Sequence, residues 1–256
     1  MAQMTGRTAV ITGAAHGIGR AIALTLAQRG CDIGMLELDM EAAQQVAADI
    51  KALGRKVTIQ SCDVTKPDQV TSASAALLKA MGPCDILVNN AGICRMGDLL
   101  TMDETDWRAL FAVNVDGVFH VTRAIVPQMV ERGAGAVVNL SSWMGKSGHP
   151  GYGAYCATKF AIIALTQTLA LELGPKGVRV NAVAPGLIVN TVMRDEAEDY
   201  MQERGLPMAA DRAQSIPLRR AGLPQDIANT VAYLASDEAS YMTGEVVNVT
   251  GGLWNG

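Results

Sequence analysis

TAVITGAAHGIG, at residues 8–19, joins a short β-branched run to a glycine-rich turn. The run from Thr8 to Thr12 has the composition of a buried strand. Residues 20–29 follow with apolar side chains at helical spacing, and Gly30 ends this segment. Strand, glycine turn and helix therefore occur in the order that a dinucleotide-binding site requires.

Three glycines of this turn match the needs of a bound pyrophosphate. Gly13 permits the tight turn, Gly17 allows the backbone to approach the phosphates, and Gly19 allows the helix to pack closely on the strand. His16 and Ile18 lie between them, where the N-terminus of the helix would face the phosphates. The spacing is G-x-x-x-G-x-G and not the common G-x-G-x-x-G, so a purely structural glycine turn is the alternative.

Seven short β-rich runs alternate with helical stretches along the chain. Such alternation predicts parallel strands joined by crossover helices, and hence an α/β fold with a doubly wound sheet and helices on both faces. No linker or internal repeat interrupts residues 1–256, which favours a single domain. The predicted strands are residues 8–12, 32–37, 57–61, 85–89, 136–140, 179–184 and 245–249.

Composition and charge argue against several classes of protein. The chain is 49% apolar with a formal net charge of −4, so it has no basic footprint for nucleic acid or anionic membranes. No uninterrupted apolar run reaches the ~18 residues of a spanning helix, and no apolar leader opens the sequence. The five cysteines lack C-x-x-C spacing, which favours a reducing cytoplasm. The three histidines are dispersed, so no metal site is predicted.

A second informative stretch is SWMGKSGHPGYGAYCATK, residues 142–159. Tyr155 and Lys159 lie four residues apart near the start of a helical pattern over residues 154–174, so both side chains share one helix face. A nearby cation favours the phenolate and lowers a tyrosine pKa from about 10 toward neutral pH. Tyr155 is therefore a candidate general acid/base, with an ordinary helix face as the alternative.

Together these stretches resemble the short-chain dehydrogenase/reductase family, and the resemblance extends over essentially the whole chain. It implies a Rossmann-type, seven-stranded, mostly parallel sheet, and hydride transfer between a nicotinamide cofactor and a secondary alcohol/ketone pair. The motifs that carry it occur in order: Thr12-Gly13-x-x-x-Gly17-x-Gly19, Asp63-Val64, Asn89-Asn90-Ala91-Gly92, Asn114, Ser142, Tyr155-x-x-x-Lys159, Asn181 and Pro185-Gly186.

The resemblance implies a catalytic role for four side chains. Tyr155 would exchange a proton with the substrate oxygen, and Lys159 would lower the phenol pKa and bind the nicotinamide ribose. Ser142 would orient the same oxygen, which leaves Ser141 as a structural hydroxyl. Asn114 would hold a water that connects Lys159 with solvent. Asn114 lies inside a single long helix predicted over residues 103–132, where asparagine is mildly unfavourable.

An acidic side chain sets the expected cofactor preference. Glu37 directly follows the last apolar residue of the second strand, about 20 residues beyond the glycine turn, where a carboxylate accepts the adenosine ribose hydroxyls. A 2′-phosphate would be repelled there, and no arginine is at hand for it. NAD is thus favoured over NADP. Asp39 is the alternative acceptor.

The remaining cofactor contacts are expected at the carboxyl ends of the strands, where ligands bind in open α/β sheets. By resemblance, Asp63 would contact the adenine and the backbone of Ile188 the nicotinamide carboxamide. Asn190 occupies the place of a threonine in the common pattern, so a contact from Thr191 stays open. The predicted residues at these strand ends are Asp63, Val64, Asn90, Ala91, Gly92, Pro185, Gly186 and Ile188.

Substrate and assembly are expected as follows. Residues 189–215 are polar and weakly patterned, typical of a movable lid or of a plain pair of surface helices. Polar side chains near Trp143 and Met144 favour a polyol or small hydroxy-ketone: Ser147, His149, Tyr152 and Asn190. The alternatives are a carrier-bound 3-oxoacyl reductase, which would want NADPH, and a non-catalytic binding or regulatory protein. The resemblance further implies a homotetramer.

Overall fold

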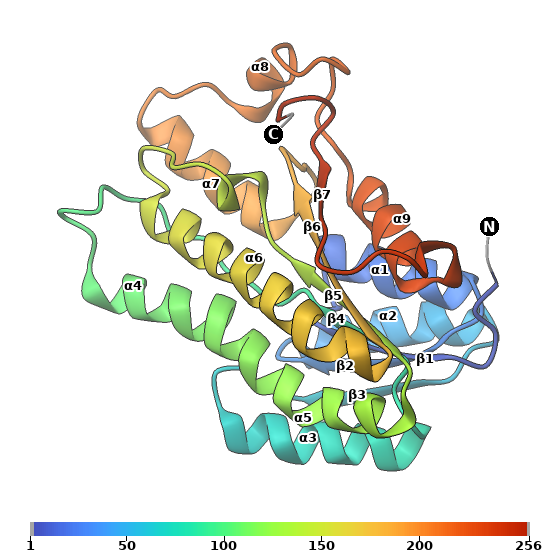
Figure 1. Cartoon of the computed structure of the whole chain (residues 1–256). Helices are drawn as coiled ribbons and strands as arrows, with labels where there is room; N and C mark the ends of the chain where they lie inside the picture. Colours follow the sequence, from blue (N-terminus) through green and yellow to red (C-terminus); the bar gives the residue numbers. More distant parts are fainter. Residues whose placement is uncertain (1–2, 255–256) are drawn as a thin grey trace.

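The computed structural model describes residues 3–254 and contains one parallel sheet of seven strands. Their order is β3-β2-β1-β4-β5-β6-β7, so the chain reverses its direction of winding between β1 and β4 (Figure 1). Each predicted strand is confirmed to within one residue at either end. The strands are β1 (Thr8–Thr12), β2 (Asp32–Glu37), β3 (Val57–Ser61), β4 (Ile86–Asn89), β5 (Gly135–Leu140), β6 (Val178–Pro185) and β7 (Val246–Val249).

Helices cover both faces of the sheet. One layer consists of α1, α2 and α9, and the other of α3, α5 and α6, so the predicted doubly wound arrangement is confirmed. The helices are α1 (Gly17–Gln28), α2 (Met40–Ala52), α3 (Pro67–Met81), α4 (Glu104–Phe111), α5 (Gly117–Arg132), α6 (Gly153–Leu173), α7 (Val192–Glu203), α8 (Ala209–Ala213) and α9 (Pro224–Ala235).

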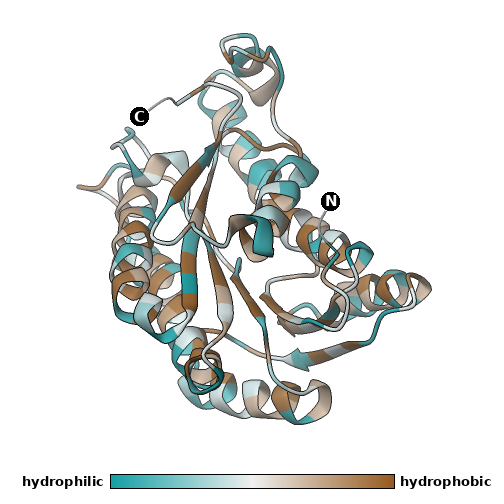
Figure 2. Ribbon diagram, turned by 45° about the vertical axis from the view of Figure 1, so that its right-hand side comes forward, coloured by the Kyte–Doolittle hydropathy of each residue, from teal (hydrophilic) through white to brown (hydrophobic). Residues whose placement is uncertain are grey.

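Alternation along the central strand divides the core between the two layers. Ala9 and Ile11 pack on the side of α1 and α9, whereas Val10 packs on the side of α3 and α5. The inner strands are apolar along most of their length (Figure 2), because both of their faces are buried, whereas the edge strands β3 and β7 are half-buried. Burial on both faces thus holds the strand ends rigidly in place.

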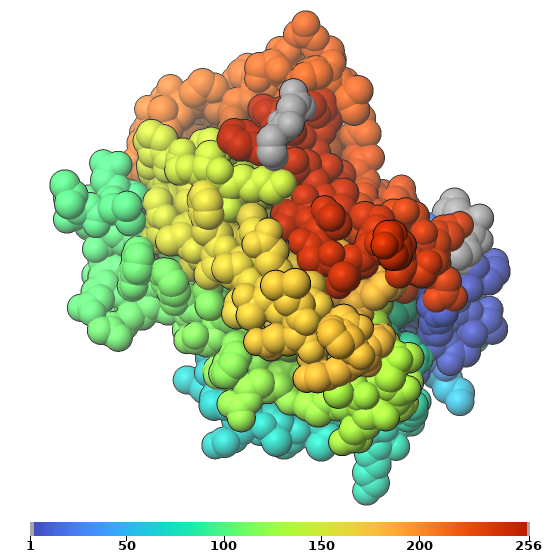
Figure 3. Space-filling view, viewed as in Figure 1, coloured from blue at the N-terminus to red at the C-terminus, as the bar shows by residue number. Residues whose placement is uncertain are grey.

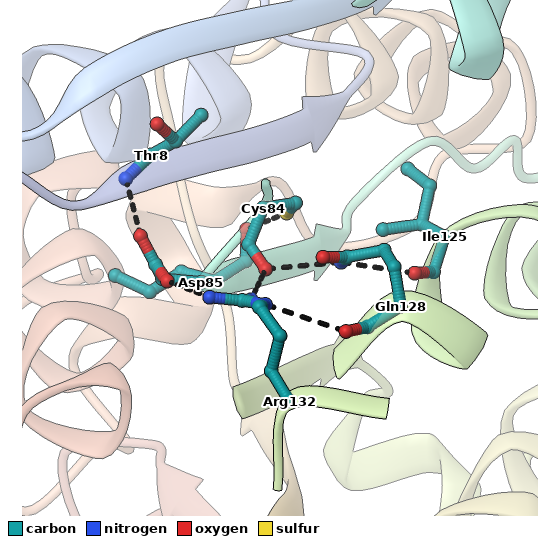
Figure 4. Close-up of polar contacts among 7 residues, drawn as sticks. Thr8, Cys84, Asp85, Ile125, Gln128 and Arg132 are labelled. Carbon is teal, nitrogen blue, oxygen red and sulfur yellow. Dashed lines mark hydrogen bonds and ion pairs between the residues drawn. The ribbon is translucent and has the colours of Figure 1, made fainter. Parts of the chain in front are cut away.

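A polar network ties helix α5 to the amino-terminal edge of the sheet (Figure 4). Asp85 accepts the backbone N–H of Thr8 at 2.9 Å and forms an ion pair with Arg132 at 2.8 Å. Arg132 and Gln128 both donate to the carbonyl of Cys84. These contacts anchor α5 at the edge opposite the carboxyl ends of the strands.

The long helix predicted over residues 103–132 is not regular throughout. It consists of α4, a π-helical turn over Ala112–Asp116, and α5. Asn114 lies in that turn and is buried, with its side chain bonded to the backbone of Ile93 in both directions, at 2.9 Å each. The prediction of one uninterrupted helix is therefore wrong here, because a tertiary contact widens the turn, as is common at functional sites.

Two helical stretches have the length and composition of membrane spans. Glu104–Arg132 and Gly153–Lys176 are long and apolar enough to cross a membrane when up to two charged residues are allowed in 18, whereas the sequence contains no uninterrupted apolar run of that length. Core helices of water-soluble proteins pass the same test. Here α5 and α6 pack one face against the sheet, so the finding is weak evidence for a membrane.

The predicted lid segment lies beyond the carboxyl end of β6 and contains α7 and α8. In the space-filling view of Figure 3, this segment gathers at the same end of the molecule as the loop after β5 and the C-terminal segment after β7. Three parts that are distant in sequence thus enclose the carboxyl edge of the sheet.

Candidate active site

A cavity of about 260 Å³ lies at the carboxyl edge of the sheet, at the point where the winding reverses. Open α/β sheets bind their ligands at this position. Of the predicted site residues, Glu37, Asp63, Val64 and Asn114 lie outside its lining. The others line it together: Gly13, His16, Gly17, Ile18, Gly19, Asn90, Ala91, Gly92, Ser142, Tyr155, Lys159, Pro185, Gly186 and Ile188.

Tyr155 is buried at the wall of this cavity, near the start of α6. Burial raises the pKa of its phenol above the ordinary value, while a hydrogen bond with Ser142 and the charge of Arg194 act in the opposite direction. The sequence predicts a net lowering of this pKa by Lys159. In the structure the cost of burying a phenolate outweighs the lowering effects, so that expectation is wrong for the protein alone.

Lys159 is buried one helical turn from Tyr155, and its ammonium lies 5.5 Å from the centre of the phenol ring. Its Nζ donates to the carbonyl of Leu140 at 2.9 Å. Burial lowers the pKa of Lys159 from 10.5 to about 8. Because one hydrogen bond to the protein leaves further donors on the ammonium, Lys159 can also bind a ligand oxygen.

The two serines after β5 have different partners. The Ser142 hydroxyl accepts the backbone N–H of Met144 at 3.2 Å and lines the cavity. The Ser141 hydroxyl donates to the carbonyl of Lys159 at 2.9 Å and so ties β5 to α6. Successive side chains of a strand end point to opposite sides, which explains why the neighbours differ.

Asn114 lies behind the cavity lining and holds two segments together. Its amide donates to the hydroxyl of Thr158 at 3.1 Å, in addition to the paired bonds with Ile93. A Cβ on Gly92 would lie 3.2 Å from the Asn114 carbonyl oxygen and 3.6 Å from the Lys159 ammonium. Asn114 and Lys159 therefore face each other across Gly92, where a side chain would crowd the Asn114 oxygen.

The glycine turn has the shape and the donors for a dinucleotide. Gly17 has a φ of +47°, and a Cβ on Gly19 would stand 1.9 Å from the carbonyl oxygen of Gly13, so no side chain fits there. His16 makes no side-chain cap bond to α1, whose first turn contains no acidic residue. The N–H groups at the start of α1 are thus suited to a phosphate. The residues present fit the predicted cofactor.

The side chains of Glu37 and Asp39 both lie beside the glycine turn. Glu37 accepts the N–H of Ala15 at 2.8 Å with one oxygen and the N–H groups of Leu38 and Asp39 with the other. Asp39 caps α2 and bonds the His16 ring at 2.8 Å. Glu37 therefore lies against the turn itself, whereas Asp39 reaches it through the His16 ring.

Asp63 and Val64 stand apart from the cavity. The Asp63 carboxylate accepts both the N–H and the hydroxyl of Thr65, at 2.9 and 2.7 Å. The Val64 carbonyl lies 3.0 Å from the His120 ring. These contacts hold Asp63 in a local turn with Thr65, and its contact with the adenine stays a prediction.

Residues of the lid segment contribute more to the cavity than the sequence indicates. Asn190 adopts a left-handed φ of 61°, and Thr191, not Asn190, lines the cavity, with its methyl group 3.1 Å from the position of a Cβ on Gly17. Arg194 and Cys94 also line it and were not predicted. The sequence signals this arrangement only by the position of Thr191, which comes one residue later than the threonine of the common family pattern.

A Rossmann-type sheet, a glycine turn at its switch point and a tyrosine–lysine pair in the adjoining cavity define a dinucleotide-dependent oxidoreductase. The family model described as enoyl-(acyl carrier protein) reductase matches residues 13–254. The chain belongs to the short-chain dehydrogenase/reductase family, as the sequence predicts.

Individual relatives differ in what their names state. The chain is 40% identical over 252 residues to the 3-oxoacyl-(acyl-carrier-protein) reductase FabG of Staphylococcus epidermidis, covering 97% of this chain and 99% of that one. Among solved structures, NAD⁺-bound xylitol dehydrogenase has a TM-score of 0.92 at 33% identity, covering 97% and 99% of the two chains. Levodione reductase has a TM-score of 0.93 at 31% identity, covering 98% of each.

Proposed function

We propose that this enzyme transfers a hydride reversibly between NAD and a small secondary alcohol or its ketone. The observation that carries the proposal is the convergence of Ser142, Tyr155 and Lys159 in the cavity that also reaches the glycine turn. The nicotinamide ring, when bound, accepts or supplies the hydride.

The chain's own residues would handle the proton. Ser142 donates to the substrate oxygen and holds it beside the phenol of Tyr155, which takes or gives the proton. Lys159 holds the nicotinamide ribose and stabilises the phenolate during the transfer. Asn114, which lies across Gly92 from the ammonium, would hold the relay water that replaces the proton.

The proposal is tested with a panel of polyols, hydroxy acids and hydroxy-ketones, assayed with NAD and with NADP by the absorbance of the reduced cofactor. We expect NAD-dependent oxidation of at least one small secondary alcohol. Absence of turnover with every compound and both cofactors, by a folded protein that binds NAD, would contradict it.

A carrier-bound 3-oxoacyl reductase is the second candidate. The 40% identity to the FabG of Staphylococcus epidermidis favours it. Reduction of a 3-oxoacyl thioester far faster than any free ketone would establish this alternative. Glu37 at the glycine turn argues against the NADPH that such an enzyme would want.

Replacing Glu37 should shift the cofactor preference from NAD toward NADP. The double change Glu37→Ser and Leu38→Arg removes the repulsion of a 2′-phosphate and adds a guanidinium, which exchanges charge-assisted bonds of about 1.5–3 kcal/mol each. We expect the ratio of kcat/KM for NAD over NADP to fall by about tenfold or more. Leu38 is exposed, so it tolerates the arginine.

Asp39→Asn is the matched control for this experiment, because Asp39 is the other acidic side chain at the turn. It should leave the ratio nearly unchanged. If Asp39→Asn changes the ratio of kcat/KM for NAD over NADP and the double variant at Glu37 and Leu38 does not, then Asp39 binds the adenosine ribose.

We also propose a single domain, with residues 189–215 as its lid, that works in the cytoplasm as a homotetramer. Apolar side chains exposed on α5 and α6 support the assembly: Phe119, Phe160 and Leu171. Light scattering at micromolar concentration should yield four times the chain mass of 26.9 kDa. A monomer mass would rule the assembly out.

A further inference from the structure

Two polar groups of the cavity have no part in the proposed proton transfer. Arg194 lies in the first turn of α7, and Tyr152 precedes α6. The Nε of Arg194 is buried and has no hydrogen-bond partner among the described residues, and the buried hydroxyl of Tyr152 lies against the Arg194 side chain, whose hydrogen bond opposes the rise in the pKa of Tyr152. Buried polar atoms are nearly always paired, so the unpaired Nε of Arg194 at the wall of a cavity indicates a ligand.

The charge of Arg194 is only weakly balanced by its neighbour. Its Nη1 lies 3.5 Å from Glu198, but both oxygens of Glu198 accept the backbone N–H of Ala209, at 3.2 and 2.9 Å. No Asp or Glu is among the described residues that line the cavity, whereas Lys159 and Arg194 both line it. With Lys159 assigned to the nicotinamide ribose, Arg194 is the cation of the cavity that an anionic group of the substrate can bind.

Arg194 also lies close to the reacting end of the cavity. Its charge opposes the effect of burial on the pKa of both Tyr152 and Tyr155. Arg194, Tyr152 and Tyr155 line the same cavity, so an anionic group bound to Arg194 can belong to the same small molecule as the hydroxyl that faces Tyr155.

Building on the proposed function, we infer that the substrate is a small hydroxy acid or oxo acid, whose carboxylate binds Arg194 and Tyr152. A guanidinium presents a planar fork of donors that matches the two oxygens of a carboxylate. The Tyr152 hydroxyl supplies one more donor to the same group. Arg194 is thus the specificity-determining residue, and the lid segment supplies it.

Matched pairs of substrates test this inference, because they differ only in a carboxylate or a hydroxymethyl group. The pairs are 2-hydroxybutyrate with butane-1,2-diol, and 3-hydroxybutyrate with butane-1,3-diol. For at least one pair we expect kcat/KM to favour the acid by about tenfold to a hundredfold, the range of charge-assisted bonds. Arg194→Met should lower kcat/KM for the acid by about tenfold more than for the diol, so that most of this preference is lost.

Arg194→Lys separates charge from shape, since it keeps the cation and loses the fork; we expect it to restore only part of the preference. Arg204→Met is the matched control, because Arg204 ends the same helix and stacks on Tyr200 outside the cavity. It should retain the full preference.

Binding provides a readout that needs no turnover. Calorimetry of the preferred acid with the Tyr155→Phe variant and NAD should detect binding, and adding Arg194→Met should weaken it by about tenfold or more. Two further compounds are assayed beside the acids. Glycerol 3-phosphate carries a phosphate in place of the carboxylate, and the N-acetylcysteamine thioester of 3-oxobutyrate carries an acyl thioester in its place.

The outcomes separate the two proposals. Oxidation of the diols as fast as the acids, or equal losses with both in Arg194→Met, would overturn the carboxylate assignment and leave the hydride transfer standing. Preference for the phosphate or the thioester would overturn it as well. If no compound is turned over, the proposed function fails, and unweakened binding of the acid by the Arg194→Met variant would refute the inference independently.

Discussion

Tyr155→Phe should lower kcat by about 10³-fold or more while the fold and the affinity for NAD stay near those of the wild type. The change removes the only proton that the phenol can transfer and leaves a ring of nearly the same shape in the same buried place. General acid/base catalysis contributes about 10² to 10⁴ in rate, and no other hydroxyl of the cavity has a lysine one turn away. Steady-state kinetics and NAD titration measure the two effects separately.

Tyr241→Phe is the control for this experiment, because Tyr241 is fully exposed at the opposite edge of the sheet. It should keep the wild-type rate. If Tyr155→Phe retains more than a small fraction of the activity, the proton is carried by another group. Tyr152 would then be the first to examine, since its hydroxyl lies in the same cavity.

Lys159→Met should reduce both kcat and the affinity for NAD, because one ammonium is proposed to hold the ribose and to stabilise the phenolate. Each function rests on charge-assisted hydrogen bonds of about 1.5–3 kcal/mol, so kcat/KM should fall by about two orders of magnitude or more. A variant that keeps the wild-type affinity for NAD and the wild-type pH optimum would disprove the coupling between Tyr155 and Lys159.

The same variant should be no less stable than the wild type at neutral pH. Burial lowers the folded-state pKa of Lys159 to about 8, below its ordinary 10.5, so the folded protein holds its proton less tightly than the unfolded chain. The resulting penalty, roughly 3 kcal/mol, is complete below about pH 8 and disappears as the pH rises to 10.5. Loss of the bond to Leu140 offsets part of the gain.

Denaturant unfolding of both proteins across this pH range measures the effect. The free energy of unfolding of the wild type, relative to Lys159→Met, should rise between about pH 8 and 10.5. A constant difference between the two proteins would mean that Lys159 does not titrate with a lowered pKa. Such a gain in stability with a loss of activity is common at active sites.

Local sequence alone determined the framework of this protein. Each strand is a short apolar run enriched in β-branched residues, and its ends are marked by glycine or polar residues, so the bounds of the strands could be predicted to within one residue. Tyr155 and Lys159 share a face because a helix repeats every four residues or so, which needs no tertiary information. The glycine turn could also be predicted from local sequence, because steric limits on the backbone act within a few residues.

The tertiary structure decided the local backbone conformation of the site, the side chains that line it and the pKa of its phenol. The π-helical turn at Asn114 exists because its side chain bonds Ile93, some 20 residues away, and the left-handed Asn190 sets Thr191 against Gly17. Arg194 looks like one charge among many in a polar segment until α7 covers the cavity. The phenol pKa is raised, not lowered, because desolvation depends on every element that packs around a group, and no spacing along the chain records that sum.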